Sequence, residues 1–368
     1  MSSFRLALLS IALVLAAGSA VAADKAQDFL AAHMDTAVDP GVDFFEYANG
    51  GWLKAHPIPA YEAAWGIGNE VDDELYARLR GISESAAAQK AAPGSDQQKI
   101  GDFWATAMDV AQADRVGLHP LDPELARIDA ISSLAGVLDT VFAWKPMGVD
   151  ALFRIRIAQD DKDSATMAVH IRQGGLGLPE RDFYFNPEAG VARIRAAYVE
   201  HVARTFRLLG RDPAAAKDAA AKVMAFETAL AKASRKLEDL RDPEKNYNKM
   251  TPAELTAKST RSIDWSARLA AWNLHPSCVL AGQPEFLAAE DRLLRETPLP
   301  VLKDYLRYHL VDGYAPFLSA AFDEEHFDFH GRAMSGQKEQ RPRWKRALDE
   351  ENDAMGMVLG RIFVKDYF

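Results

Sequence analysis

The sequence predicts a mainly α-helical fold that contains a β-hairpin. Apolar residues recur with helical spacing over most of the chain, and the clearest alternation of apolar and polar residues lies within about residues 152–172. Of the 368 residues, 48% are hydrophobic and one is cysteine, so core packing without an intrachain disulfide must hold the fold. This composition excludes collagenous, disordered and disulfide-framework chains.

The N-terminus has the pattern of a secretory signal peptide over residues 1–23. Arg5 precedes an apolar run, residues 6–17, and small residues follow as far as Ala23. We expect cleavage after Ala22 or Ala23 and export to the periplasm or the extracellular space. The run is shorter than the roughly 20 apolar residues of a membrane-spanning helix, but an uncleaved anchor remains an alternative. Residues 24–368 would then form one mostly helical domain.

Helical periodicity covers most of that domain. An Ala, Gln, Pro and Gly-rich linker over residues 86–95 separates the first two helices. Gly210 and Pro213 separate two later helices, the second of which is rich in alanine. The predicted helices cover residues 69–90, 96–111, 191–209, 213–235, 302–317 and 343–368.

The hairpin is predicted by the alternation of Phe153, Ile155 and Ile157 with arginines. A polar turn over residues 159–164 leads to a second strand with the same alternation. Glycines at 174, 175 and 177 follow this strand. No G-x-G-x-x-G or G-K-[ST] pattern occurs there and no helix begins at once, so we interpret the segment as a turn rather than a phosphate loop.

The last helix begins at about Arg343 and has the apolar stripe Trp344, Leu348, Met355, Leu359 and Ile362. It reaches Phe368 without a C-terminal cap. We expect its apolar face to need a partner and the architecture to be incomplete.

The charge balance disfavours polyanionic partners. The chain has 43 Lys and Arg against 53 Asp and Glu, a net charge of −10, so neither nucleic acid nor an anionic membrane surface attracts it. The basic run at residues 341–346 includes Trp344, but acidic residues follow directly. We interpret the run as a solvated helix face.

No histidine is followed by glutamate, so the zinc-peptidase motif H-E-x-x-H is missing. His326 and His330 have its spacing, with Phe327 at the position of the base. Glu325 and Asp328 could add ligands. The alternation around Phe327 and Phe329 predicts an extended or turn segment, in which the two imidazoles are too far apart for easy chelation.

Other candidates have simpler interpretations. No G-x-S-x-G nucleophile motif occurs, and His170 should lie on the polar face of the hairpin. The acidic pairs at 72–73 and 324–325 should be solvated, and Cys278 should be an inert small residue. The sequence therefore predicts no catalytic, cofactor-binding or metal-binding residue in this chain.

Four blocks, in order, resemble the neprilysin/endothelin-converting-enzyme family of zinc metallopeptidases. They are Asp39–Pro59 (DPGVDFFEYANGGWLKAHPIP), Gly175–Tyr184 (GLGLPERDFY), Tyr247–Met250 (YNKM) and Phe327–Arg346, which contains FDFHGRAMSG and RPRWKR. The resemblance covers nearly everything from about residue 35 to the last residue.

The resemblance implies an exported peptidase or ectoenzyme that cleaves short peptides, in which a mostly helical domain covers a thermolysin-like zinc domain and encloses a size-limiting cavity. This chain is similar to the N-terminal, helical part. The family's H-E-x-x-H and Asn-Ala-aromatic motifs are missing here. E-x-x-x-D spacing occurs at Glu238/Asp242 and Glu324/Asp328, but without H-E-x-x-H upstream we interpret both as chance matches. In relatives the block around His326 and His330 is structural, and an aromatic residue usually stands at the second histidine. Trp65 stands where some animal members have a substrate-binding arginine.

We therefore expect the N-terminal part of an exported zinc metalloendopeptidase, with the C-terminal catalytic zinc domain absent. Zinc and peptide substrates belong to the complete enzyme, and this chain alone should bind no zinc and hydrolyse no peptide. One alternative is a non-catalytic, peptide- or partner-binding helical module. Another is a split peptidase, whose catalytic half is a separate polypeptide that meets the last helix.

Overall fold

The computed structural model of the chain describes residues 29–368, so the predicted signal peptide lies outside the described residues. The chain divides into two compact units, one up to Val71 and one from Asp72 onward. Among the described residues, no helix is long and apolar enough to cross a membrane.

The first unit contains α2 (Phe29–His33) and α3 (Phe44–Ala55). Asp43 caps α3, because its carboxylate accepts a hydrogen bond of 2.9 Å from the backbone N–H of Glu46. A Cβ on Gly50 would lie 2.8 Å from the Cβ of Asp35, so the close approach of the two segments requires glycine. Trp52 stacks on His56 with ring centroids 4.6 Å apart. These contacts give local structural roles to much of the sequence block at 39–59.

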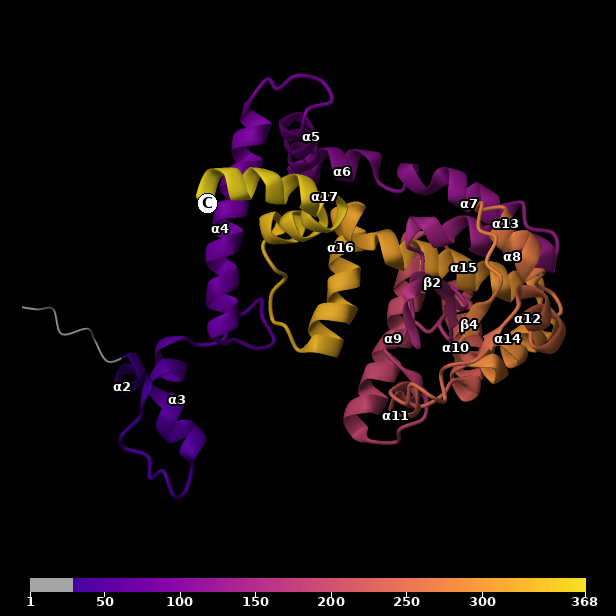
Figure 1. Cartoon of the computed structure of the whole chain (residues 1–368), viewed down its shortest axis with the longest axis horizontal. Helices are drawn as coiled ribbons and strands as arrows, with labels where there is room; N and C mark the ends of the chain where they lie inside the picture. The colour runs from indigo at the N-terminus through magenta and orange to yellow at the C-terminus, as the bar shows by residue number, and fades with distance from the viewer. Residues whose placement is uncertain (1–28) are drawn as a thin grey trace, which may run out of the picture. The chain divides into compact units, whose positions relative to one another are not determined.

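The second unit is mostly helical, with a small sheet among the helices (Figure 1). Helix α4 begins in the first unit and continues into the second. Short 3₁₀ turns connect several helices, and a π-helical segment, η5 (Asp328–Met334), follows α16 directly. The helices are α4 (Ile67–Ala88), α5 (Asp96–Met108), α6 (Val110–Val116), α7 (Asp122–Asp129), α8 (Leu134–Trp144), α9 (Ala189–Leu208), α10 (Pro213–Ala233), α11 (Leu237–Leu240), α12 (Pro252–Lys258), α13 (Trp265–Ala270), α14 (Pro284–Glu296), α15 (Leu299–Tyr314), α16 (Ala320–Phe327) and α17 (Arg343–Tyr367).

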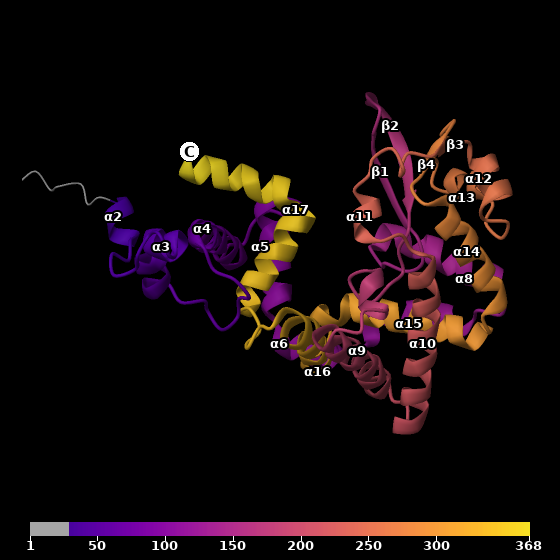
Figure 2. The same cartoon turned by 90° about the horizontal axis from the view of Figure 1, so that it is seen from below.

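The predicted hairpin is confirmed as β1 (Arg154–Asp160) and β2 (Asp163–Arg172), which pair antiparallel with Ile155 opposite Ile171. Two short strands that the sequence did not predict, β3 (Lys249–Met250) and β4 (Val279–Ala281), complete a sheet in the order β1-β2-β4-β3. Strand β4 runs parallel to β2 and antiparallel to β3. The tip of the hairpin extends beyond the neighbouring helices (Figure 2).

The largest apolar cluster joins the sheet to α8, α9, α10, α14 and α15. Helix α15 lies at its centre, and Leu302, Tyr305, Leu306, Tyr308 and Leu310 are almost completely buried. The helices predicted over residues 191–209, 213–235 and 302–317 correspond to α9, α10 and α15, which all contribute side chains to this cluster. The mainly helical fold with a hairpin is therefore confirmed.

The prediction that the apolar stripe of the last helix needs an outside partner is wrong. Helix α17 packs against α5 and α4 of the same chain (Figure 1). Leu348 contacts the cluster around Trp104, and Leu359 contacts Ile82 and Ile100. The stripe is covered because two helices from the start of the unit pack on it, which periodicity within α17 cannot reveal.

Two ionisable groups are buried close to the sheet. The Nζ of Lys145 donates a hydrogen bond of 2.7 Å to the carbonyl oxygen of Ala151, and burial lowers the pKa of Lys145 to about 8. Glu290 on α14 is fully buried, and its carboxylate oxygens have no hydrogen-bond partner among the described residues. Burial therefore raises the pKa of Glu290 to about 8, and the group is mostly protonated at neutral pH.

Glu290 should make stability depend on pH. Between pH 4.5 and about 8 the folded state retains a proton that the unfolded state releases, so the free energy of unfolding falls as the pH rises. The contribution is at most about 1.4 kcal/mol per pH unit. Glu290→Gln removes this pH-dependent contribution. In urea denaturation at pH 6, 7 and 8, the free energy of unfolding of the variant minus that of the parent should therefore become steadily more positive as the pH rises.

The matched control is Glu296→Gln, an exposed residue at the end of the same helix. Its stability difference from the parent should stay constant over this range. A constant difference for Glu290→Gln as well would contradict the assignment.

Candidate functional site

A cavity of about 640 Å³ lies within the second unit, between α5, α6, α16, η5 and α17. Much of its wall is apolar and includes Phe103, Phe317 and Phe327. Polar side chains enter it from α16 and η5, among them His326 and His330. The cavity therefore combines an apolar wall with groups that can exchange protons or donate lone pairs.

The segment that carries His326 and His330 is helical, so the prediction of an extended segment is wrong. Residues 320–327 form α16, and the backbone continues into the π-helical η5. Phe327 and Phe329 suggested alternation because both are buried, at 7% and 1% exposure, but they are buried within consecutive helical turns. Residues four apart lie close together there, and the two imidazole rings stack with centroids 4.1 Å apart.

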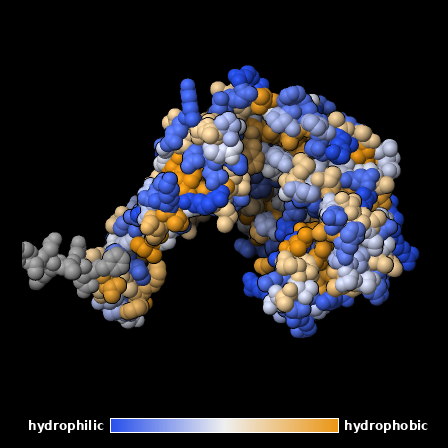
Figure 3. Space-filling model, turned by 45° about the horizontal axis from the view of Figure 1, so that its top comes forward, coloured by the Kyte–Doolittle hydropathy of each residue, from blue (hydrophilic) through white to orange (hydrophobic). Residues whose placement is uncertain are grey.

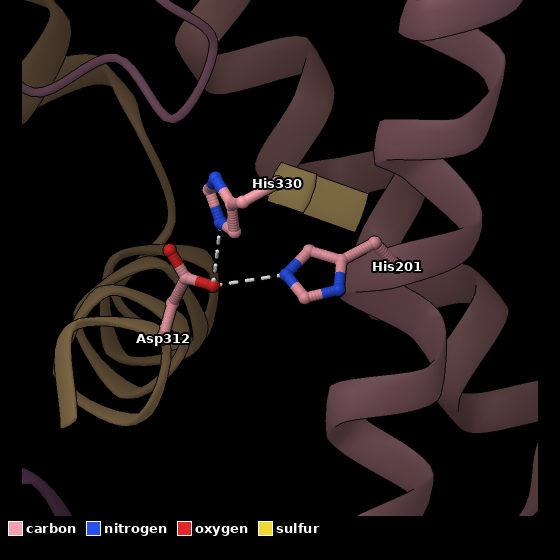
Figure 4. Close-up of side chains that lie close together, drawn as sticks. All are labelled: His201, Asp312 and His330. Atoms are coloured by element: carbon pink, nitrogen blue, oxygen red, sulfur yellow. Dashed lines mark hydrogen bonds and ion pairs between the residues drawn. The ribbon is translucent and has the colours of Figure 1, made fainter. Parts of the chain in front are cut away.

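His330 belongs to a cluster with His201 of α9 and Asp312 of α15 (Figure 4). The Nε2 atom of His201 lies 2.9 Å from Oδ1 of Asp312, and Nε2 of His330 lies 3.2 Å from the same oxygen. One potential ligand atom from each residue lies within 4.8 Å of the others. Within the described part of the chain, this arrangement has the geometry to hold a metal ion.

Two further charged residues surround the cluster. Oε1 of Glu325 lies 3.0 Å from Nδ1 of His201, whose side chain is only 2% exposed. The Nε of Arg204 lies 3.2 Å from the same glutamate oxygen. The solvated environment predicted for the acidic pair at 324–325 is therefore wrong for Glu325, which faces a buried histidine.

The pKa values in the cluster reflect competition between burial and pairing. Burial raises the pKa of Asp312, but the hydrogen bonds to His201 and His330 outweigh it and hold the pKa well below its usual range. Burial lowers the pKa of His201, yet the bonds to Asp312 and Glu325 leave it raised. For His326, burial and the neighbouring His330 outweigh the carboxylates of Asp312 and Asp323 and lower the pKa to about 4, so its ring is neutral at pH 7.

The cluster does not match the zinc site of an H-E-x-x-H peptidase. That motif places two histidines from one helix on the ion and a glutamate beside the first. Here His326 stacks on His330 instead of joining the cluster, and Phe327 occupies the glutamate position. These residues therefore do not provide the two ligands and the adjacent base of an H-E-x-x-H peptidase.

The basic run at 341–346 is not a solvated helix face, and that interpretation is wrong. Arg346 forms two hydrogen bonds with Asp323, of 2.9 and 3.0 Å, and Arg341 binds Asp349 at 2.7 Å. The side chain of Lys345 is 4% exposed and pairs with Asp73. Asp73 and Asp323 are distant from the run in sequence, so the local pattern could not reveal these two pairs.

His170 also differs from expectation. It lies on β2 but is 1% exposed, and its Nε2 lies 2.9 Å from the carbonyl oxygen of Gln159. The glycine-rich exit of the hairpin is irregular backbone with φ of +75° at Gly175, in agreement with a turn. Cys278 is partly exposed and has the hydroxyl of Ser277 as a neighbour.

A second cavity, of about 430 Å³, lies beside the hairpin and is lined mainly by basic side chains. Its lining includes Lys145, Arg154, Arg156 and Arg172, together with His170. The alternation of arginines on β1 had identified the polar side of the strand but not the concave surface to which it contributes.

Sequence reasoning also missed a buried polar network around Glu227 of α10. This carboxylate is fully buried and accepts hydrogen bonds of 2.7 Å from Tyr184 and 2.8 Å from Tyr198. Nε2 of His309 lies 2.9 Å from it. The available signal was a glutamate on the same helical face as Val223 and Leu230, but its partners are distant in sequence.

A family model and the curated proteins to which this chain is similar indicate the same family. The model of peptidase family M13, in its N-terminal form, matches residues 40–368. Endothelin-converting enzyme-like 1 of Rattus norvegicus is 30% identical over 364 residues, 94% of this chain and 46% of that protein. Endothelin-converting enzyme 1 of Homo sapiens is 27% identical over 91% of this chain and 44% of that protein.

Solved structures of zinc metalloproteases and related proteins agree with the family match. The zinc metalloprotease ZMP1 of Mycobacterium tuberculosis, in complex with an inhibitor, is similar with a TM-score of 0.85 and 30% identity, over 91% of this chain and 51% of that one. PepO of Lactobacillus rhamnosis shares the fold with a TM-score of 0.74 at 17% identity, over 89% of this chain and 51% of that one.

The chain thus spans about half the length of the relatives it matches. The family match includes the helices from α3 to α17, the sheet and the cavity between α5, α16 and α17. This chain belongs to peptidase family M13 and corresponds to the N-terminal region of its zinc metallopeptidases.

Proposed function

We propose that this chain serves as the N-terminal, cavity-forming part of an exported zinc metalloendopeptidase that cleaves short peptides. The observation that carries the proposal is the similarity to ZMP1, which extends over 91% of this chain but only 51% of that zinc metalloprotease. The export signal predicted over residues 1–23 supports action outside the cytoplasm.

The chain's own contribution is to binding rather than to bond cleavage. The cavity of about 640 Å³ has an apolar wall that suits side chains of a bound peptide, and its polar groups can orient a backbone. Arg346 is held by Asp323 beside this cavity, so its position is fixed before any ligand enters. Zinc, where the family's motif is present, supplies a Lewis acid and activates water for attack on a peptide bond.

Peptide hydrolysis by this chain alone is disfavoured by its sequence. An M13-type site needs two histidines and a glutamate from one helix, and no histidine in the sequence is followed by glutamate. We therefore propose that hydrolysis depends on a polypeptide that carries H-E-x-x-H, whether continuous with this chain or separate.

The C-terminal part of α17 offers a surface for that polypeptide. Met357 is 86% exposed, Val364 58% and Phe368 92%, whereas the opposite side of the helix packs on α4 and α5. Large exposed apolar side chains in a cluster indicate an interaction surface. Apolar surface is also visible in several patches between polar regions in the space-filling view (Figure 3).

The purified 368-residue chain, supplied with Zn²⁺, should not hydrolyse short fluorogenic peptides above the rate of Zn²⁺ in buffer. The reason is the missing pair of histidine ligands with an adjacent glutamate base. Initial rates would be measured across gel-filtration fractions, before and after addition of a chelator. Chelator-sensitive hydrolysis that follows the protein at constant specific activity would disprove the proposed dependence on another segment.

We expect a reading frame downstream of the codon for Phe368, in the same or another frame, to encode H-E-x-x-H. Reading all frames downstream is the measurement. If no neighbouring frame encodes the motif, and no co-purifying polypeptide of the exported fraction contains it, the stand-alone partner-binding module is favoured instead.

Export should depend on the apolar run within residues 6–17. Val14→Arg interrupts that run and should leave the uncleaved precursor in the cytoplasm, whereas the parent should yield a mature N-terminus at Ala23 or Asp24. Cell fractionation and N-terminal sequencing measure both. Gln89→Arg adds the same charge at an exposed position and should be exported normally; equal export of Val14→Arg would exclude the signal.

A further inference from the structure

We propose that His201, Asp312 and His330 form a binding site for a divalent transition-metal ion such as Zn²⁺, separate from the catalytic zinc of the M13 family. The three residues come from α9, α15 and η5, and their donor atoms converge at one point beside the 640 Å³ cavity (Figure 4). This departs from the expectation, drawn from the sequence, that the chain has no metal ligand.

The spacing of the donor atoms fits a first coordination sphere. Zinc–nitrogen and zinc–oxygen bonds of about 2.0–2.2 Å place neighbouring tetrahedral ligands about 3.3 Å apart. The two histidine Nε2 atoms lie 2.9 and 3.2 Å from Oδ1 of Asp312. The remaining pair lies within 4.8 Å, so a small approach of the two rings completes the arrangement.

The types of donor select the class of metal. Two imidazoles and one carboxylate suit zinc and its neighbours among the first-row transition metals, whereas Ca²⁺ and Mg²⁺ prefer six or more oxygen ligands. Only Asp312 offers a carboxylate within the three-residue group. We therefore expect Zn²⁺ or Co²⁺ to bind and Mg²⁺ not to compete.

The surroundings of His201 have the form found around metal-bound histidines. Its Nδ1 lies 3.0 Å from Glu325, and a carboxylate on the far nitrogen fixes the tautomer and directs the other lone pair toward the ion. Arg204 in turn pairs with that glutamate. Phe329 stacks on the His201 ring with centroids 4.9 Å apart, which limits rotation of the ring.

A bound ion would connect three elements that are far apart in sequence. His330 lines the cavity, while His201 is almost fully buried. Three protein donors leave a fourth position for water or for a ligand in the cavity. The site would therefore stiffen the cavity wall formed by α16 and η5, and ligands with a free carboxylate or imidazole could reach the ion.

The competing interpretation is a metal-free ion pair in which a protonated His201 bridges Asp312 and Glu325. Both arrangements use the same side chains. They differ in whether the folded chain takes up an ion at one defined place, and this difference can be measured without peptidase activity.

The test uses the full chain, stripped of metal with EDTA and desalted. Isothermal titration calorimetry with ZnCl₂ should give one ion per chain, and CoCl₂ should produce visible absorption bands that Zn²⁺ abolishes but Mg²⁺ does not. His330→Phe and Asp312→Asn should lose this stoichiometric binding. Glu325→Gln removes the outer carboxylate and should weaken binding about 10- to 100-fold.

Two matched controls remove histidines outside the site. His326→Phe keeps a ring stacked on position 330, and His119→Gln changes a histidine with 81% side-chain exposure; both should bind Zn²⁺ like the parent. Circular dichroism verifies that each variant is folded. No binding by the folded parent, or parent-like binding by folded His330→Phe or Asp312→Asn, would overturn the proposal.

If both ligand variants fail to fold, zinc K-edge X-ray absorption of the parent decides the question. Two imidazoles in the coordination sphere of one stoichiometric ion support the site, and any sphere without them rejects it. The outcome is independent of the proposed peptidase role, because neither binding nor spectroscopy requires peptide hydrolysis.

Discussion

Three polar side chains of the buried helix α15, Tyr305, His309 and Asp312, form hydrogen bonds inside the protein, and much of the second unit is arranged around them. Tyr305, His309 and Asp312 share one helical face because they are spaced at i, i+4 and i+7. The hydroxyl of Tyr305 accepts a hydrogen bond of 2.9 Å from the backbone of Leu152 and donates one of 2.9 Å to Gly175. An unpaired buried polar group costs about 1–3 kcal/mol, so each of these bonds constrains the packing.

Each bond on that face positions a different neighbour. Tyr305 connects the start and the exit of the hairpin, which is why Gly175 closely approaches the tyrosine oxygen. His309 reaches Glu227 on α10, and Asp312 reaches α9 and η5 through two histidines. The histidine–carboxylate cluster is thus the last part of a continuous row of polar contacts, and its geometry depends on the same helix that organises the apolar core.

Local patterns predicted the elements well because their causes are local. The alternation at Phe153 and Ile155 identified β1, and the helical periodicity over residues 191–209 identified α9. The family blocks identified the M13 region. The histidine–carboxylate cluster could not be predicted from the sequence, because His201 and His330 lie 111 and 18 residues from Asp312 along the chain. The error at His326 has a physical cause: the change from α- to π-helix brings Phe327 and Phe329 both into the core and imitates a strand.

The pairing of α17 with α4 and α5 also has a consequence for synthesis on the ribosome. The apolar residues Ile82 and Ile100 leave the ribosome long before Leu359, which covers them in the folded chain. At about 5–20 residues per second, the roughly 260 residues between Ile100 and Leu359 take on the order of ten to fifty seconds to make. For that interval α4 and α5 remain without their packing partner, so their apolar faces stay exposed until α17 has been synthesised.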